Sequence, residues 1–359
     1  MDKVVVGMSG GVDSAVAAYL LKQAGYDVIG ITLRTWQSED GSESRCCEID
    51  DARSVANRLG IAYLPVNCTL EFQKKVVDPF AAEYLRGRTP NPCVECNRFV
   101  KWEKLLYYAR ILGASHIATG HYASVLRLDN ERYTVQKALH AEKDQTYMLY
   151  KLTQEQLAAT LMPLGRLTKD EVRQIARDAG LPVASKPDSQ EVCFVTNGTY
   201  ADFIEKAADA ALPGEGAFVD EAGNILGKHK GIIRYTVGQR KGLGLALGAP
   251  AYVKEIRAET NEVVLGDAQS LYCDALLCRD VNFLSIPGLA EGETLPCTVK
   301  IRYHHGGQSA SVSMRTDGRA AVSFDAPVRA AAPGQSAVFY DKEERVIGGG
   351  IIDEVSPSV

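Results

Sequence analysis

The chain has 359 residues, of which 46% are hydrophobic and 24% are charged, and its formal net charge at pH 7 is −5. This length accommodates two or three domains, and the composition excludes a fibrous or wholly disordered polymer. The charge excludes a histone-like wrapper of nucleic acid but permits a local basic face. No stretch approaches 18 consecutive apolar residues, and the N-terminus shows no cleavage-like site, so we expect a cytoplasmic protein without a membrane span.

The first half of the chain alternates between strand and helix patterns. Apolar, β-branched runs predict strands at 3–8, 28–33, 61–66 and 116–119, and helical spacing predicts helices at 15–24, 52–59, 70–87 and 97–112. This alternation is typical of an α/β fold, a parallel sheet covered by helices on both faces. The prolines at positions 90 and 92 predict that residues 88–93 form an exposed loop.

The pattern changes after about residue 200 to short segments rich in Gly and β-branched residues. From residue 272 onward, alternating segments are separated by turn signals such as Asp317-Gly318, which predicts a small β-barrel or sandwich. We therefore expect an α/β catalytic domain over 1–200, a small Gly-rich central domain over 201–272 and a C-terminal β-barrel over 273–359.

The segment Gly7-Met8-Ser9-Gly10-Gly11-Val12-Asp13-Ser14 lies where the first predicted strand meets the first predicted helix. Its glycines allow backbone N–H groups to approach an anion, its serines add hydroxyl donors, and the helix N-terminus adds partial positive charge. A carboxylate beside phosphates is repulsive unless a cation lies between them, so Asp13 is a candidate Mg²⁺ ligand. The lysine of G-x-x-x-x-G-K-S/T loops is absent, which excludes a γ-phosphate kinase cradle. The alternative is that Gly10-Gly11 only makes a tight turn.

Nine cysteines in a chain predicted to be cytoplasmic favour catalysis, redox chemistry or metal ligation over a disulfide scaffold. Cys96 precedes a predicted helix, whose N-terminal dipole would lower the thiol pKa. Cys193 follows a polar turn, and its alternative is a small apolar side chain in a strand. The adjacent pair Cys46-Cys47 could hold a metal, but such pairs on polar loops are more often bystanders.

The string from Ser9 to Ser14 resembles the pyrophosphate-loop (PP-loop) signature of ATP pyrophosphatases, which adenylate a substrate oxygen and release pyrophosphate. Together with the cysteine segments it resembles one family closely, the bacterial tRNA-specific 2-thiouridylases, which put sulfur on C2 of the wobble uridine. The resemblance covers nearly the whole chain, through 120–123, 143–147, 229–231 and 235–244. It implies an adenine nucleotide α-hydrolase-like fold with ATP and Mg²⁺, and an ATP site lined by Gly7, Met8, Ser9, Gly10, Gly11, Val12, Asp13, Ser14, Leu33 and Gly120.

The same resemblance assigns roles to two cysteines. Cys96 matches the nucleophile, and Cys193 matches the cysteine that receives sulfur as a persulfide from a donor protein, either a cysteine desulfurase or a relay. Sulfur transfer would leave a disulfide between them for a reductant to reopen. Cys93 departs from the family, which usually has Asp after Asn-Pro. The resulting Cys93-x-x-Cys96 spacing, with Cys193 as a third ligand, suits a 4Fe-4S cluster. In this alternative to the persulfide route, the cluster would bind the sulfide that is transferred.

Candidate tRNA contacts lie in several segments. Residues 228–241 carry Lys228, Lys230, Arg234, Arg240 and Lys241 without an acid, a pattern that favours a phosphate-binding strip over a merely solvated surface. The loop Asn91-Pro92-Cys93 is expected to face the extruded uridine. The resemblance adds His121, Lys143, Asp144, Gln145, Arg302, Tyr303 and Gln335. For His121 the alternative is a core histidine, and for Arg302 and Tyr303 it is an ordinary strand surface.

We therefore expect a monomeric, ATP-dependent sulfur transferase acting on the anticodon stem-loop of tRNA. A synthetase that forms an amide or guanidine on a small metabolite would share the ATP loop, but it would leave Cys96 and Cys193 without a role. An ATP-gated tRNA-binding adaptor would need no chemistry at all, so the formation of AMP separates it from the enzyme.

Overall fold

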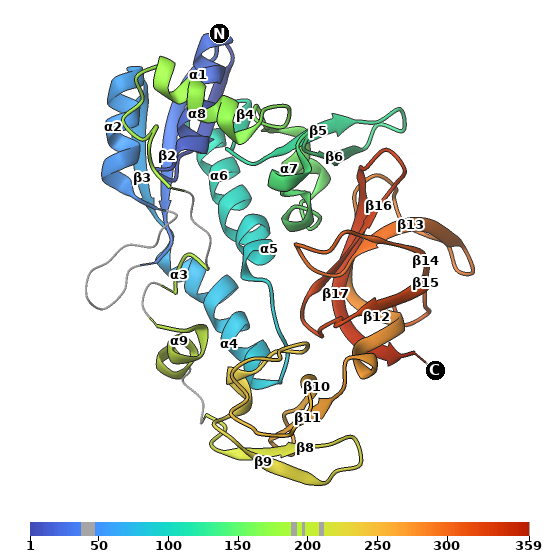
Figure 1. Cartoon of the computed structure of the whole chain (residues 1–359). Coiled ribbons are helices and arrows are strands. Elements are labelled where there is room, and N and C mark those ends of the chain that lie inside the picture. Colours follow the sequence, from blue (N-terminus) through green and yellow to red (C-terminus); the bar gives the residue numbers. More distant parts are fainter. Residues whose placement is uncertain (37–46, 188–191, 196–197, 208–211, 359) are drawn as a thin grey trace. The chain divides into compact units, whose positions relative to one another are not determined.

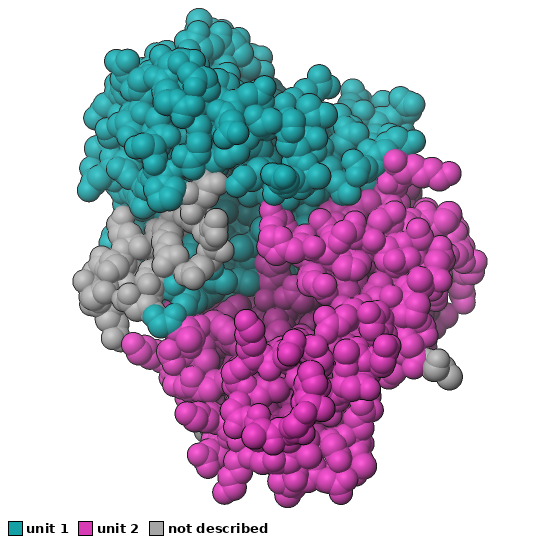
Figure 2. Space-filling model, viewed as in Figure 1, with its two compact units in different colours: residues 1–76, 92–198, 343–346 teal, residues 77–91, 199–342, 347–359 magenta. Residues whose placement is uncertain are grey.

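The computed structural model describes residues 1–36, 47–187, 192–195, 198–207 and 212–358 (Figure 1). It divides into two compact units, residues 1–76, 92–198 and 343–346 in the first, and residues 77–91, 199–342 and 347–359 in the second (Figure 2). No helix in the described part of the chain is both long enough and apolar enough to cross a bilayer.

The first unit is built on a five-stranded parallel sheet in the order β3-β2-β1-β4-β7. Its strands are β1 (Lys3–Gly7), β2 (Asp27–Arg34), β3 (Ala62–Asn67), β4 (His116–Ala118) and β7 (Thr160–Leu161). The strand order reverses at β1, because β2 and β3 extend the sheet on one side and β4 and β7 on the other. Ligands of open α/β sheets bind at such a switch point, outside the carboxyl ends of the strands.

Helices cover both faces of this sheet, which confirms the predicted fold class. The main ones are α1 (Val12–Gln23), α2 (Ile49–Leu59), α6 (Glu103–Ile111) and α8 (Lys169–Asp178). Val4 and Val6 belong to one core with α1, α2 and α8, whereas a Cβ on Gly7 would point at Leu105 of α6, 3.1 Å away. Alternate residues of β1 therefore face opposite helical layers.

Shorter elements complete the first unit. They are α3 (Thr69–Phe72), η1 (Gln73–Val77), which runs to the first residue of the second unit, α5 (Pro92–Cys96), η2 (Asn97–Trp102), the hairpin β5 (Ala123–Arg127) and β6 (Tyr133–Lys137), η3 (Ala141–Lys143), η4 (Thr146–Met148) and α7 (Gln154–Ala158). Residues 343–346 of the later chain pair with this hairpin, where Gln136 forms a β-bridge with Arg345.

The prediction of an exposed loop over 88–93 is wrong in two respects. A helical run begins at Pro92 and continues through α5, η2 and α6, because proline restricts the residue before it but is well suited to the first turn of a helix. Residues 88–91 are half-buried rather than exposed. Cys96 lies inside the helical run, with φ −59° and ψ −45°, so the argument that a helix N-terminus activates its thiol is also wrong.

The second unit contains a small sheet and a closed barrel. The sheet has the order β10-β11-β8-β9, and the barrel has the order β12-β15-β14-β13-β16-β17. Their strands are β8 (Gly216–Val219), β9 (Ile225–His229), β10 (Tyr252–Arg257), β11 (Glu262–Gly266), β12 (Tyr272–Phe283), β13 (Thr294–Lys300), β14 (Gln308–Met314), β15 (Ala320–Arg329), β16 (Ser336–Tyr340) and β17 (Val346–Pro357). The helices are α4 (Asp78–Leu85), α9 (Tyr200–Ala207), η5 (Ile232–Arg234) and η6 (Gln269–Leu271). Closure confirms the barrel and removes the exposed edges that a sandwich would leave.

The segment that follows α4 is attached to the barrel. The Thr89 amide donates to the Pro333 carbonyl at 2.8 Å, and the Gln335 side chain donates to the Thr89 carbonyl at 2.8 Å. Between them, Gly334 has φ +92°, and a Cβ there would lie 2.9 Å from the Thr89 nitrogen. Residues 88–91 have no secondary structure of their own, and these contacts with residues 333–335 hold them against the barrel.

Candidate functional site

The loop between β1 and α1 is closed on itself by hydroxyl groups. The Ser14 hydroxyl accepts a hydrogen bond from the Ser9 amide at 3.1 Å and donates to the Gly11 carbonyl at 3.1 Å. The Gly11 amide donates to the Ser9 hydroxyl at 3.3 Å. These bonds fix the course of the loop at the sheet's switch point, where a phosphate group would meet backbone N–H groups and the start of a helix.

Two glycines are required by close packing at this loop. Gly10 has φ +82°, and a Cβ there would lie 2.6 Å from the Glu48 carbonyl oxygen. Gly120, just beyond β4, would place a Cβ 2.7 Å from backbone atoms of both Asp13 and Ser14. The turn after β4 therefore packs directly against the first turn of α1, and these two of the four glycines predicted to line the ATP site lie at the loop.

Buried side chains support the loop from the β2 side. Met8 is 2% exposed and Leu33 is 8% exposed. The Thr32 hydroxyl donates to the Met8 carbonyl at 2.6 Å and accepts from the Tyr63 hydroxyl at 2.8 Å. Of these two residues predicted to line the ATP site, Met8 belongs to the same buried core as α1, and Leu33 is a buried residue of β2.

Asp13, the predicted Mg²⁺ ligand, is held by two other side chains. The Lys169 ammonium lies 2.7 and 2.8 Å from its two carboxylate oxygens, and the Tyr122 hydroxyl donates to Oδ1 at 2.8 Å. Mg²⁺ typically uses one or two carboxylates together with substrate phosphates and waters, so Asp13 fits the ion if the ammonium moves aside. No local sequence pattern indicates a functional role for Lys169, since only the Thr168 capping box that begins α8 marks this position.

A second lysine, Lys186, lies on the other side of the loop. It forms ion pairs with Glu48 and Asp51 at the start of α2 and donates to the Gly10 carbonyl at 3.4 Å. Desolvation disfavours its charged form, but the bonds to Asp51 and Glu48 outweigh this effect and raise its pKa. Lys186 therefore stays charged and ties α2 to the loop, and no local sequence pattern indicates this role either.

The helix that carries Cys93 and Cys96 is fixed by its polar neighbours. Cys93 is half-buried, and Cys96 is only 5% exposed. Glu95, between them, pairs with Lys151 at 2.6 Å, and the Asn97 side chain donates to the Met148 carbonyl at 3.1 Å. These two contacts tie the helical run that carries the thiols to residues 148–151.

Cys193 lies in a turn rather than in a strand, and it is half-buried. The next residue, Phe194, packs edge to face on Phe72 with ring centroids 5.5 Å apart. Across the described residues, no group of three or more His, Cys, Asp or Glu side chains is arranged to hold a metal ion, so Cys93, Cys96 and Cys193 are not gathered as ligands. Cys46 lies outside the described residues, and Cys47 is buried.

Two of the motifs expected to contact tRNA meet in the first unit. The Tyr122 amide donates to the Gln145 side chain at 2.9 Å, and the Gln145 amide donates to the Tyr122 carbonyl at 3.1 Å. Asp144 is buried and accepts from Thr146, which indicates a structural role, whereas Lys143 is half-buried. Since Tyr122 also contacts Asp13, these segments connect with the ATP loop.

His121 is hydrogen-bonded to Thr119 at 2.9 Å, and its ring lies 5.3 Å from that of Trp102. Desolvation, together with the nearby Lys101 cation, lowers the pKa of His121 to about 3. The ring is therefore neutral at physiological pH and can offer tRNA a hydrogen bond or a stacking face, but no charge.

The predicted cationic strip is only partly present in the second unit. Lys228, Lys230, Arg240 and Lys241 are exposed. Arg234, in contrast, pairs with Asp202 and Glu205 of α9, so the expectation that it adds to an acid-free strip is wrong. The acids come from a helix about thirty residues earlier, which the local charge pattern could not reveal.

The remaining candidates lie on or beside the barrel. Arg302 is exposed and donates to the Arg329 carbonyl at 3.0 Å, and Tyr303 is half-buried. Gln335 is bonded to Thr89, in the segment that also contains Asn91. Gln335 thus supports the chain that leads into the Cys93 helix.

Comparison with known proteins identifies three successive family matches. They are described as the tRNA methyl transferase HUP domain over residues 2–197, the tRNA methyl transferase PRC-barrel domain over 201–267 and the aminomethyltransferase beta-barrel domain over 273–352.

Curated relatives match almost the whole chain. The tRNA-specific 2-thiouridylase MnmA of Lachnoclostridium phytofermentans is 53% identical over 360 residues, covering 98% of this chain and 99% of that one. The MnmA of Acetivibrio thermocellus is 53% identical over 358 residues, with the same coverage. A solved U34-tRNA thiolase, NcsA from Methanococcus maripaludis with its 4Fe-4S cluster, is 21% identical, with a TM-score of 0.36 over 57% of this chain and 63% of that one. That weak likeness does not bear on the chemistry. From the curated relatives and the family matches, the chain belongs to the tRNA-specific 2-thiouridylase family.

Proposed function

We propose that this protein is an ATP-dependent tRNA sulfurtransferase that replaces the C2 oxygen of the wobble uridine with sulfur. The observation that carries the proposal is the hydrogen-bonded loop at the β1/β4 switch point, in a chain 53% identical to tRNA-specific 2-thiouridylases over 98% of its length. A loop of this kind, without the lysine of kinase cradles, suits cleavage that releases pyrophosphate.

The first step makes a leaving group. The C2 oxygen of the uridine attacks the α-phosphorus of ATP, pyrophosphate departs, and the base becomes adenylated. The loop amides and the serine hydroxyls of residues 9–14 bind the phosphates and stabilise the developing charge. Mg²⁺, with Asp13 as its protein ligand, would neutralise further charge on the phosphate oxygens.

The second step brings sulfur to C2. A donor protein, a cysteine desulfurase or a relay, leaves a persulfide on Cys193. Cys96 attacks the inner sulfur of that persulfide and releases hydrosulfide, which adds to C2 and expels AMP. Cys96 and Cys193 are left as a disulfide, which an external thiol reductant reopens. The uridine has to leave its stack to reach these groups, and the segment Asn91-Pro92-Cys93 would face it.

A persulfide route is favoured over a cluster route by the arrangement of the thiols. A 4Fe-4S cluster would need Cys93, Cys96 and Cys193 as ligands of one metal centre, and the described residues show no such group. The tRNA would be held by the exposed cations of 228–241 together with His121, Lys143, Arg302 and Tyr303. We further propose that the protein works as a cytoplasmic monomer, with domain boundaries at 200 and 272.

The reaction itself is tested with purified protein, ATP, Mg²⁺, unmodified tRNA and a cysteine desulfurase with its substrate. We expect 2-thiouridine and AMP in equal amounts, measured by mass spectrometry of nucleosides and by chromatography of nucleotides. ADP as the nucleotide product would overturn the mechanism.

The cysteine roles are tested by substitution. Cys96→Ser and Cys193→Ser should abolish thiolation while tRNA binding is kept, and Cys297→Ser in the barrel serves as the matched control. Cys93→Ala should keep substantial turnover in the persulfide route. Its complete inactivity, together with stoichiometric iron and acid-labile sulfide in anaerobically purified protein, would establish the cluster route instead.

A further inference from the structure

A lysine from a distant segment lies at the ATP loop. Loops of the G-x-x-x-x-G-K-S/T type carry their own lysine for the phosphates, and the loop of this chain has none. The structure places the Lys169 ammonium 2.7 and 2.8 Å from the two carboxylate oxygens of Asp13, in the first turn of α1. The positive charge missing from the loop sequence is thus present in the folded site.

The position of this lysine is built into the fold. Lys169 is the first residue of α8, which starts at a capping box formed by Thr168 and Glu171. Val172 of α8 belongs to the same buried core as Ala15 and Ala18 of α1. The Lys169 side chain is only 13% exposed, and its ammonium lies 6.0 Å from the centre of the Tyr122 ring. Helix packing and an aromatic face therefore direct the ammonium to the loop.

Charge determines what the ammonium does when nucleotide arrives. The phosphates of ATP bring several negative charges to a loop that already carries Asp13, and this carboxylate alone would repel them. A lysine has a flexible four-carbon stem and three rotatable donors, so its ammonium can move from a carboxylate to an adjacent phosphate oxygen.

We propose that Lys169 is a further ATP-binding residue, whose ammonium group pairs with Asp13 in the free protein and contacts the phosphates when nucleotide binds. Its positive charge stabilises the negative charge that builds up on the departing pyrophosphate. The inference rests on the proposed function in so far as the nucleotide is ATP.

Lys186, the other lysine at the loop, is less suited to this role. Two carboxylates, Glu48 and Asp51, hold it at the start of α2, and moving it to a phosphate would leave both beside the anion. Lys169 pairs with only one carboxylate, that of Asp13. A bound cation can balance the charge of Asp13 when the ammonium moves to a phosphate. The geometry thus distinguishes a phosphate-binding lysine from a structural one.

The test is calorimetric titration of the full chain with α,β-methylene-ATP in EDTA, without tRNA or sulfur donor. We expect Lys169→Met to weaken binding at least tenfold, Lys169→Arg to restore part of the affinity, and Lys206→Met, an exposed lysine of α9, to leave it unchanged. Unfolding curves of each variant establish that it is folded.

A double variant separates a phosphate contact from mere neutralisation of Asp13. Asp13→Asn should bind the analogue more tightly than the parent protein in EDTA, because repulsion is removed and Lys169 is released. Asp13→Asn with Lys169→Met should bind at least tenfold more weakly than Asp13→Asn alone. Equal affinities of these two would overturn the inference. If the parent protein does not bind the analogue with Mg²⁺ in place of EDTA either, the proposed ATP-dependent function fails as well.

Discussion

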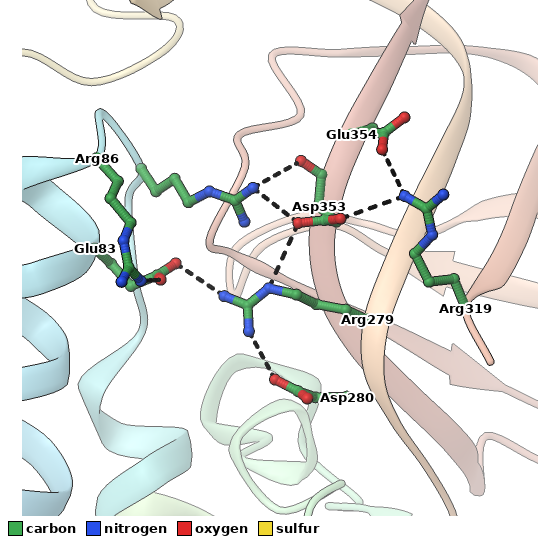
Figure 3. A network of polar contacts seen from close by, with 8 residues as sticks. Glu83, Arg86, Arg279, Asp280, Arg319, Asp353 and Glu354 are labelled. Carbon is green, nitrogen blue, oxygen red and sulfur yellow. Dashed lines mark hydrogen bonds and ion pairs between the residues drawn. The ribbon is translucent and has the colours of Figure 1, made fainter. Parts of the chain in front are cut away.

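Arg88 and Asp353 are separated by 265 residues in the sequence, yet the Arg88 guanidinium donates to the Asp353 carboxylate at 2.8 Å. Two more guanidinium groups approach the same carboxylate, those of Arg319 at 3.4 Å and Arg279 at 3.5 Å (Figure 3). Arg279 also pairs with Glu83 of α4 at 3.0 Å. One carboxylate of β17 thus anchors α4 and the segment that runs directly into the helix with Cys93 and Cys96.

Replacing this carboxylate should loosen the segment. Asp353→Asn keeps the size of the side chain but removes the negative charge that three half-buried guanidinium groups share, so we expect a loss of about 1.5–3 kcal/mol in the free energy of unfolding. Hydrogen exchange at residues 86–91 should become faster. Asp325→Asn, an exposed carboxylate of β15, is the matched control and should change neither quantity. Unaltered exchange at 86–91 in Asp353→Asn would show that the network does not hold the segment.

The two adjacent glycines of the ATP loop should differ in their tolerance of a methyl group. Gly10→Ala forces a Cβ to within 2.6 Å of the Glu48 carbonyl at φ +82°, and a strained residue of this kind costs about 1–3 kcal/mol. Gly11 has φ −92°, and its nearest neighbour, the Ser9 hydroxyl, would be 3.4 Å away. We expect urea unfolding to show a clear loss of stability for Gly10→Ala and little for Gly11→Ala. Equal losses would contradict the close approach of Glu48.

Burial of His121 should make stability depend on pH. The pKa of His121 is about 3 in the folded protein, against an ordinary value of 6.5. As the pH falls, His121 therefore binds a proton at a higher pH in the unfolded chain than in the folded protein. The stability from the neutral ring is complete above pH 6.5 and is lost toward pH 3, by about 1.4 kcal/mol per pH unit.

The His121→Gln variant should therefore lose stability less steeply than the parent protein between pH 6.5 and 4, measured by urea unfolding at each pH. Carboxyl groups contribute equally to both proteins, so the difference reports on His121. The exposed His304, replaced by Gln, is the control and should leave the slope unchanged. Parallel curves for His121→Gln and the parent would refute a depressed pKa.

The exposed cations of 228–241 should contribute to tRNA binding through phosphate contacts. Single Gln substitutions of Lys228, Lys230, Arg240 and Lys241 are each expected to weaken binding and to reduce the slope of log affinity against log salt by about one. Lys206→Gln on α9 is the control. Filter binding between 50 and 300 mM salt measures the slopes, and four unchanged slopes would place the tRNA elsewhere on the protein.

Local patterns predicted much of the first unit. The apolar run at 3–8 is observed as β1 (Lys3–Gly7), and the run at 28–33 lies within β2 (Asp27–Arg34), because the alternation of a buried strand is a property of neighbouring residues. The junction of strand, glycines and helix at residues 7–14 likewise depends on chain neighbours, so an ATP-type loop was readable before any fold was known. The proline rule failed at Pro92, because the same residue that ends one helix can begin the next.

The charges around the site depended on contacts that no local pattern encodes. Lys169 meets Asp13 across 156 residues, and Arg234 is neutralised by acids of α9 that precede it by about thirty positions. By itself, then, the sequence determined the fold class and the family resemblance and predicted an ATP loop, because these rest on short-range periodicity and contiguous motifs. Only the tertiary structure decided which cations pair with which carboxylates, since Coulomb interactions and hydrogen bonds act over a few ångströms in space, whatever the separation along the chain.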